Sequence, residues 1–512
     1  MSPIVQKRIE LRRAKWYESQ REYEHSILIY QELGEYELIY QYPYKLSQLY
    51  HCIDNKFLER LWTIWNDSPY YLKCKYIRFS LLIAAIFFLW REKRKGILIL
   101  EKVEEIILKV LELSEKQKAQ LQGEIVVISA LNYDRDIIEL KKRYKSAYRL
   151  IEGPSMIYDN EVIFTEGIPS ILYRYYSTPG TLDQIVEESK TYMNDFYELT
   201  GYLGAGSEFM IQAEAKLLRG ELDEARAIAY RGIQLAEKYG QISIKIIGYL
   251  LICYTHLYLG EYKKAEEYLK IIEQETNDRE QPQIQLQVEL CYIQFHTYTG
   301  NISKIPNWIY HDHSMEAENS DLVNTYLNGC YLKQSLLRRQ NQTIIEIAEY
   351  LYEQAYDAGF LCMAIEVKMI GSIAWHRIGN KKKSIEWIKH VLDLTALDGI
   401  YMPFMRYYME LLPLFEIVIH ENGYQKTVQE IMDFYKKIEK IRKRVTIQND
   451  IKENQYGLTK RELEIAILGA RRYSNHEIAN RLYISENTVK YNMKNIFQKL
   501  DIKSRLELKK YF

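Results

Sequence analysis

The sequence predicts an all-α protein in which a long α-solenoid of helical hairpins is followed by a small C-terminal domain of four helices. Three observations support this fold class. The chain has 512 residues but only 10 Pro and 23 Gly, a composition that favours helices. A glycine-led motif returns at a regular interval along the body. Residues 457–512 carry a dense set of helix start signals.

The charges cancel over the whole chain but not locally. The chain holds 69 Lys or Arg and 69 Asp or Glu. Residues 451–512 contain 13 basic and 7 acidic residues, which leaves 56 basic and 62 acidic residues in the first 450. A small basic module is therefore attached to a mildly acidic body, and a local charge excess selects partners even in a neutral chain.

Several features predict a cytoplasmic protein. The N-terminal residues lack the apolar run of a signal peptide. The most apolar window, Phe79–Trp90, is 12 residues long, whereas a membrane span needs about 20, so we expect a buried helix there. No C-x-x-C pair occurs among the cysteines, which is typical of reduced thiols. The six cysteines are Cys52, Cys74, Cys253, Cys291, Cys330 and Cys362.

The body repeats itself, because similar hexapeptides recur at intervals of 40, 40, 40 and 79 residues. The last interval is two repeats with a degenerate member between them near Arg339, and a further candidate starts at Gly423. The clear members are "GTLDQI" at Gly180, "GELDEA" at Gly220, "GEYKKA" at Gly260, "GNISKI" at Gly300 and "GNKKKS" at Gly379.

Each repeat is predicted to be a helical hairpin. An apolar helical stretch precedes the glycine and another follows it; the glycine supplies a left-handed C-cap, and a small residue five positions later, Ala225 or Ala265, lets the helices approach closely. The pattern resembles the tetratricopeptide repeat with a longer period. We therefore expect a helical-repeat domain over residues 1–435 that serves as a sensor or interaction surface, although the fold alone does not name a ligand.

Helix caps define the C-terminal domain, which we expect over residues 457–512 after a polar linker at 436–456. Capping boxes are predicted at Thr459 with Glu462, Ser474 with Glu477 and Ser504 with Glu507, and Ser485 supplies a fourth cap. The third helix, about 486–500, places apolar residues on one stripe and polar residues on the other face. A short helix, a turn through Tyr483 and Ile484 and this helix describe a helix-turn-helix. The stripe is Val489, Met493, Ile496 and Leu500; the polar face is Asn487, Lys490, Tyr491, Lys494 and Gln498.

Residues 458–505, from "LTKRELEIAILGARRYSNHEIANRL" to "ISENTVKYNMKNIFQKLDIKSR", resemble the LuxR-type helix-turn-helix family. The family usually has Gly where this chain has Arg472, and often His where it has Asn492. The resemblance implies that double-stranded DNA is the partner. It implies base contacts by Lys490, Tyr491 and Lys494, and phosphate contacts by Ser485, Asn487, Thr488 and Lys499. Lysines facing a groove can donate to guanine acceptors.

The body, over most of residues 12–420, is similar to the helical-repeat half of MalT-like regulators, which implies an inducer or a partner protein on the solenoid. Such regulators also have a nucleotide-binding switch. No G-x-x-x-x-G-K-[ST] loop occurs here, and "GYLGAGSEF" at Gly201–Phe209 lacks the necessary Lys, so we expect no cofactor.

The sequence shows no sign of an enzyme. "HDH" at His311–His313 lacks a third ligand at a suitable spacing, so no metal site is expected, and no catalytic signature is found. The sequence therefore predicts a sequence-specific DNA-binding transcription regulator whose body senses an inducer or binds a partner protein. The alternative is a helical-repeat scaffold tethered to DNA non-specifically. The inducer, the target promoters, the sign of regulation and oligomerisation on DNA stay open.

Overall fold

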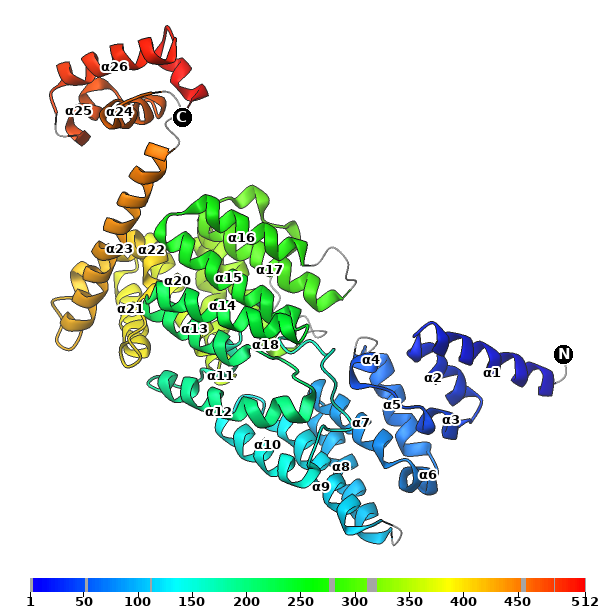
Figure 1. The fold of residues 1–512 in the computed structure, drawn as a ribbon. Helices are drawn as coiled ribbons and strands as arrows, with labels where there is room; N and C mark the ends of the chain where they lie inside the picture. The colour runs from blue at the N-terminus through cyan, green and yellow to red at the C-terminus, as the bar shows by residue number, and fades with distance from the viewer. Residues whose placement is uncertain are drawn as a thin grey trace. The chain divides into compact units, whose positions relative to one another are not determined.

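A computed structural model describes residues 3–50, 54–110, 113–275, 281–310, 320–452, 457–482 and 484–511. In these ranges all regular structure is helical, which confirms the predicted fold class. The chain forms two compact units. One consists of Met1–Thr255 and Lys263–Asp433, and the other of His256–Tyr262 and Phe434–Phe512. Figure 1 colours the chain from α1 in blue to α26 in red.

The first ten α-helices of the body include a strongly apolar helix, α7, which packs against α4, α5, α6, α8 and α9. Its residues 79–88 are all buried, so the most apolar window of the sequence forms a core helix as predicted. The ten helices are α1 (Pro3–Ser19), α2 (Tyr23–Glu32), α3 (Tyr36–Gln41), α4 (Leu46–Tyr50), α5 (Asn55–Asp67), α6 (Tyr70–Lys75), α7 (Ile77–Leu89), α8 (Lys93–Lys109), α9 (Glu115–Ala130) and α10 (Ile137–Ile151), with the 3₁₀ helix η1 (Leu131–Tyr133) before α10.

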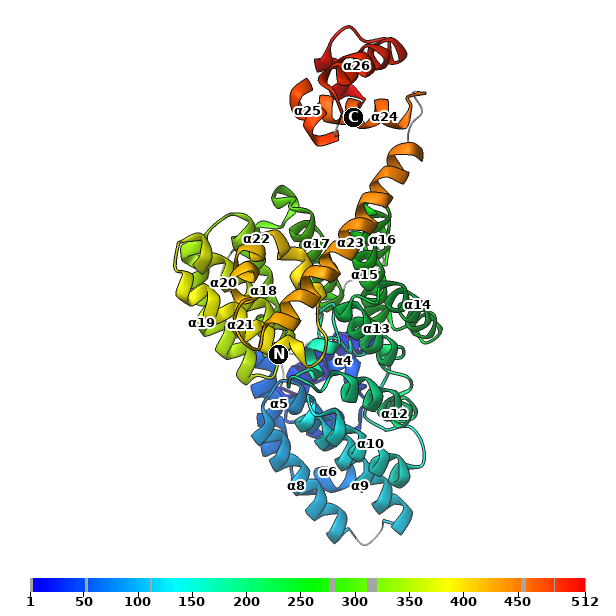
Figure 2. The same cartoon turned by 90° about the vertical axis from the view of Figure 1, so that its left-hand side faces the viewer.

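Most later helices pack as sequential hairpins. Figure 2 shows α18, α19, α20 and α21 side by side, each against the next. The helices of this part are α11 (Leu172–Tyr175), α12 (Leu182–Thr200), α13 (Ser207–Arg219), α14 (Leu222–Lys238), α15 (Ile242–Leu259), α16 (Tyr262–Gln274), α17 (Pro282–Thr299), α18 (Asp321–Leu337), α19 (Asn341–Asp357), α20 (Leu361–Arg377), α21 (Lys381–Ala396) and α22 (Met402–Val418), with η2 (Ile302–Lys304) and η3 (Asn307–Tyr310) after α17.

The repeat glycines lie at left-handed turns, as the motif predicts. Gly220 caps α13 with φ +80°, and Gly300 caps α17 with φ +75°. The degenerate repeat is confirmed as well, because Arg339 has φ +59° between α18 and α19. Ala225 and Ala265 are fully buried where their hairpins close. Each of these hairpins therefore turns at a left-handed residue, which is usually glycine and is Arg339 in the degenerate repeat.

Two repeats differ from the expected hairpin. The helix before Gly180 is only the four-residue α11, and it ends at Tyr175, so Gly180 caps no helix. Between Gly300 and α18, the described residues form only the short 3₁₀ helices η2 and η3 instead of a long second helix. Pro306 lies between them and removes a backbone donor that a continuous helix would need.

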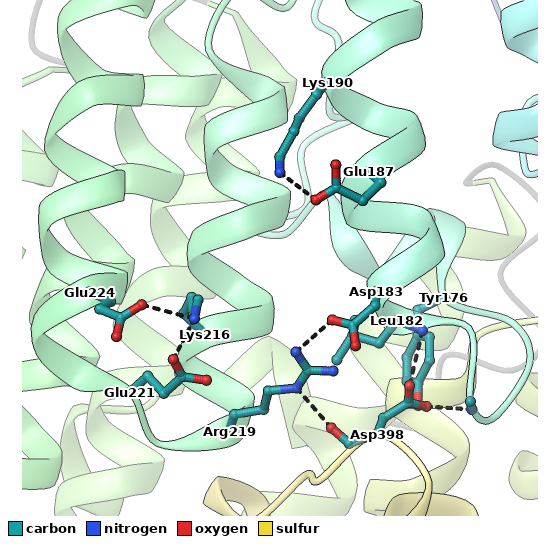
Figure 3. A network of polar contacts seen from close by, with 11 residues as sticks. Tyr176, Leu182, Asp183, Glu187, Lys190, Lys216, Arg219, Glu221, Glu224 and Asp398 are labelled. Carbon is teal, nitrogen blue, oxygen red and sulfur yellow. Dashed lines mark hydrogen bonds and ion pairs between the residues drawn. The ribbon is translucent and has the colours of Figure 1, made fainter.

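A buried carboxylate connects the late repeats to the start of α12. Asp398, in the turn after α21, accepts hydrogen bonds from the Tyr176 hydroxyl at 2.5 Å, the Gly180 N–H at 2.5 Å and the Leu182 N–H at 3.0 Å. Figure 3 shows this carboxylate beside the Arg219 side chain, whose Nε donates to the Asp398 carbonyl at 2.8 Å. Asp398 therefore caps the N-terminus of α12, although it is far from that helix in the sequence.

Residues 152–171, between α10 and α11, contain no helix, and we call them the irregular segment. Two buried glutamates hold its ends. Glu124 of α9 accepts from the Ser155 hydroxyl and the Met156 N–H, both at 2.6 Å. Glu214 of α13 accepts from the Ser170 hydroxyl and from the Ile171 N–H at 2.9 Å. These carboxylates satisfy buried backbone donors that a helix would otherwise pair internally.

One helix in the described part of the chain, α15, is long and apolar enough to cross a membrane. Its apolar window is 83% buried inside the structure, as in the core helix of a helical body. The described cysteines, Cys74, Cys253, Cys291, Cys330 and Cys362, are all free.

The predicted linker is largely helical, because α23 (Gln425–Lys452) runs through most of residues 436–456. The two compact units divide at Asp433, two residues before the end of the domain predicted at 1–435. His311–His313, Cys52 and Tyr483 lie outside the described residues.

Candidate nucleic-acid interface

The C-terminal domain consists of α24 (Lys460–Ala470), α25 (Asn475–Leu482), α26 (Glu486–Leu500) and the 3₁₀ helix η4 (Arg505–Lys510). Two predicted capping boxes are confirmed. The Glu462 carboxylate accepts from the Thr459 N–H at 2.7 Å while the Thr459 hydroxyl accepts from the Glu462 N–H at 3.3 Å. Ser474 and Glu477 exchange the same two bonds, at 2.7 and 3.2 Å. Both helices therefore start where their sequences predict.

The third predicted box is wrong. The Ser504 hydroxyl donates to the Glu507 carboxylate at 2.8 Å instead of accepting from its N–H, and the element that follows is the 3₁₀ helix η4. A 3₁₀ helix turns more tightly than an α-helix, and the Glu507 N–H is taken by the Ser504 carbonyl at 3.2 Å.

Helix α26 has the predicted bounds and the predicted apolar stripe. The Ser485 hydroxyl caps it by accepting from the Thr488 N–H at 3.1 Å. The four stripe residues are buried in one core with α24, α25 and η4. The members of this core are Leu458, Leu463, Ile465, Ala466, Ile478, Ala479, Val489, Met493, Ile496, Leu500, Ile502 and Leu508.

The polar face of α26 is exposed, as predicted. Tyr491 is 67% exposed, so its phenol is accessible to a binding partner. Lys490 forms an ion pair with Glu486 at 3.4 Å, one turn earlier. Within the described part of the chain, Lys494 has no ion-pair partner. The face therefore presents one uncommitted ammonium beside an exposed phenol.

A shallow hollow borders this face. Its lining includes Lys490, Lys494 and Gln498 of α26, with Asn475 and Arg505 from outside that helix. Arg505 is positioned by donating to the Asn475 amide oxygen at 3.0 Å and to the Tyr473 carbonyl. Arg505 thus connects η4 to the start of α25. Sequence reasoning did not identify it, because its partners lie 30 and 32 residues away.

The residues expected to contact phosphate differ in whether their side chains are already paired within the domain. Ser485, Asn487 and Thr488 are exposed at the N-terminus of α26, where unpaired N–H groups and the helix dipole favour an anion. The Lys499 ammonium instead pairs with the Glu462 carboxylate at 2.6 Å. Burial raises the pKa of Glu462, but hydrogen bonds from Lys499 and Thr459 outweigh it, so the pKa is lowered overall. Lys499 therefore also stabilises the start of α24.

The turn between α24 and α25 has the geometry of a glycine C-cap. Arg472 has φ +68°, and the Tyr473 N–H returns to the Leu468 carbonyl at 3.2 Å, as in a Schellman motif. Arg472, which stands where the LuxR-type family usually has Gly, therefore holds a left-handed position.

Comparison with known proteins identifies the domain. Residues 457–512 match the family model described as bacterial regulatory proteins, luxR family. The C-terminal domain is a LuxR-type helix-turn-helix domain. Over 54 residues the chain is 50% identical to the oxygen regulatory protein NreC of Staphylococcus carnosus (strain TM300), a match that covers 10% of this chain and 25% of that protein. The chain thus spans about a quarter of the length of this curated relative.

The body has a match of its own. Residues 204–420 match the model of the MalT-like TPR region, so the repeats from α13 to α22 are MalT-like tetratricopeptide repeats. The match begins after the irregular segment, and the likeness proposed for residues from about 12 onward is thus matched over its second half. A LuxR-type domain follows a MalT-like repeat region in one chain.

The left-handed turn of the LuxR-type domain gives a stability prediction. Arg472→Gly is expected to raise the free energy of unfolding by about 0.5–1 kcal/mol, because a non-glycine residue at positive φ carries a steric cost. The midpoint of thermal unfolding of the domain should rise. The control is Arg471→Gly at the preceding residue, whose φ is −78°; there glycine should lower the midpoint. A lower midpoint for Arg472→Gly would show that the Arg side chain contributes more than the strain costs.

Proposed function

We propose that this chain is a cytoplasmic, sequence-specific DNA-binding transcription regulator whose helical body senses an inducer or binds a partner protein. The observation that carries the proposal is the exposed face of α26 in a LuxR-type domain, where Lys494 lacks an ion-pair partner among the described residues. The basic excess of residues 451–512 supports attraction to a polyanion.

Three residues of α26 are proposed to contact base edges. Lys490, Tyr491 and Lys494 lie within little more than one helical turn and are all exposed. A lysine ammonium donates to the O6 and N7 acceptors of guanine, and a phenol can donate or accept in the major groove. Lys494 is ready to do so, whereas Lys490 would exchange its Glu486 partner for a base.

Four residues are proposed to contact phosphate. Ser485, Asn487 and Thr488 surround the N-terminus of α26, where a phosphate can accept hydrogen bonds. Lys499 is proposed as the fourth, although it pairs with Glu462. An ammonium carries three donors, so it can keep the carboxylate and still offer a hydrogen bond to a phosphate.

The test is a titration of the full chain on DNA. Footprinting first finds the preferred site, and binding is then measured on that site and on scrambled DNA at several salt concentrations. A regulator should prefer its site by about 10³-fold or more. A chain that binds both DNAs alike, with affinity governed by salt, would support the tethered scaffold instead.

Single lysine variants separate the proposed roles in the same titration. Lys494→Ala should cost roughly 1–3 kcal/mol on the preferred site and relax selectivity at one base position. Lys499→Ala should weaken binding to all sequences alike and reduce the salt slope by about one. Lys509→Ala, at an exposed lysine outside α26, is the matched control. An equal loss on both DNAs for Lys494→Ala would refute direct readout by this residue.

A further inference from the structure

Helix α23, which precedes the LuxR-type domain, carries four basic side chains on one exposed side, and we call them the basic face of α23. Its members are Lys437, Lys440, Lys443 and Arg444, all exposed. Lys440 is three or four residues from each of the others, so the four lie on the same side of the helix. In the described part of the chain, none of the four forms an ion pair. Glu439, the one carboxylate among residues 437–444, pairs with Arg442 at 3.9 Å instead.

The other side of α23 is held within the protein. Ile438 is only 2% exposed. Arg442, one turn later, donates from Nε to the Tyr258 carbonyl at 2.8 Å, and both residues belong to the second compact unit. Ile438 and Arg442 lie four residues apart and thus on one side of the helix, away from the basic face. These contacts therefore fix α23 and leave the basic face in contact with solvent.

The chemistry of this face fits a polyanion. Residues 437–444 contain five basic residues and one acidic residue. A helix that lies on a membrane needs exposed apolar side chains beside its basic ones, but none of the described large apolar side chains of α23 is strongly exposed. Double-stranded DNA carries one phosphate charge per about 1.7 Å of its axis. Four cations along about 10 Å of helix complement such a closely spaced row of charges.

The length of the intervening chain limits which DNA this face can contact. Gly457, where the match to the LuxR family begins, follows Arg444 by 13 residues. Thirteen residues span at most about 45 Å, and DNA rises about 3.4 Å per base pair. The basic face can therefore reach DNA only within about 13 base pairs of the domain, where the tether gives it a high effective concentration.

We propose that the basic face of α23 contacts the phosphates of the DNA that flanks the site bound by the LuxR-type domain. The inference rests on the proposed function, because the domain must first hold the DNA. The contact adds affinity without reading sequence, since phosphates carry no sequence information. Each phosphate contact steepens the salt dependence of binding by about 0.9, so four contacts steepen it by about 3–4.

Two DNA duplexes test the proposal with the full chain. The short duplex holds only the base pairs whose replacement weakens binding, and the long duplex adds about 15 base pairs on each side, slightly more than the reach of the tether. The slope of log affinity against log salt is measured on each. We compare slopes because longer DNA also offers more non-specific positions. The wild-type slope should be steeper by about 3–4 on the long duplex.

A combined variant removes the four charges but keeps side chains that favour a helix. It should lose the difference in slope between the duplexes and bind the short duplex as the wild type does, which shows that it is folded. Changing only the three lysines to Arg should preserve the difference, because the charge remains. The combined variant is Lys437→Gln, Lys440→Gln, Lys443→Gln and Arg444→Gln.

The matched control removes four exposed positive charges from α1, which belongs to the first compact unit. It should leave both slopes unchanged. Equal wild-type slopes on the two duplexes, or the same loss in the control, would overturn the inference. Site preference is measured separately on scrambled DNA of the long length: a lost preference with an intact slope difference would overturn the proposed function alone. The control is Arg8→Gln, Arg12→Gln, Arg13→Gln and Lys15→Gln combined.

Discussion

Asp398→Ala is expected to lower the free energy of unfolding of the body by about 3–5 kcal/mol. The substitution leaves three donors, the Tyr176 hydroxyl and the N–H groups of Gly180 and Leu182, without their acceptor. Asp398 is only 4% exposed, so water does not readily replace the carboxylate. Each unsatisfied buried donor costs about 1–3 kcal/mol. The loss is measured by urea unfolding followed by circular dichroism.

Asp183→Ala is the control from the same polar cluster. Arg219 contacts both residues: it pairs with the Asp183 carboxylate at 2.6 Å and donates to the Asp398 carbonyl (Figure 3). The Asp183 side chain, however, is 78% exposed. An exposed ion pair contributes only about 0–1 kcal/mol. If both variants lose the same small amount, Asp398 is not the anchor of α12.

The body is expected to become less stable as the pH rises from about 4.3 to about 7. Burial raises the pKa of Glu214 to about 7, although hydrogen bonds from Ser170 and from the Ile171 and Leu172 N–H groups oppose it. An unfolded glutamate has a pKa near 4.3. Between the two values the folded state holds a proton that the unfolded state has lost, so raising the pH favours unfolding.

Glu214→Gln should remove this contribution of Glu214. At about 1.4 kcal/mol per pH unit, Glu214 accounts for about 4 kcal/mol between the two plateaus. The measurement is urea unfolding of wild type and variant from pH 4 to 8. Burial also raises the pKa of Glu124, so the variant should keep part of the slope. Glu187→Gln, at an exposed side chain, shows the effect of removing a charge alone. An unchanged slope in Glu214→Gln would mean that this carboxyl stays ionised.

Local signals predicted the LuxR-type domain well. The cap at Ser485 and the stripe that ends at Leu500 gave the bounds of α26, because a cap and a 3.6-residue period lie within the helix itself. The left-handed positions of Arg339 and Arg472 followed from repeat spacing and family position. The contacts of Lys490, Tyr491 and Lys494 with bases stay a prediction.

The sequence did not predict the contacts made between distant residues. The pairing of Lys499 with Glu462 spans 37 residues, and neither residue signals the other. Glu124, Glu214 and Asp398 read as ordinary helix or turn carboxylates, because burial and partners arise only when the helices pack. The short α11, and the 3₁₀ helices η2 and η3 found after Gly300 in the described residues, were not predicted for a related reason. The hexapeptide motif indicates a turn but not the length of the helix on either side.

The Asp398 contact changes how the body can unfold. Repeats that touch only their neighbours can detach one at a time from an end of the array. The hydrogen bond from Tyr176 to Asp398 joins residues 222 positions apart, so losing α21 and α22 also uncaps α12. The repeats between Tyr176 and Asp398 therefore belong to one cooperative unit. Its folding requires the closure of a long loop, which slows folding. A truncated chain that stops before Asp398 would retain complete hairpins yet lack the residue that joins them.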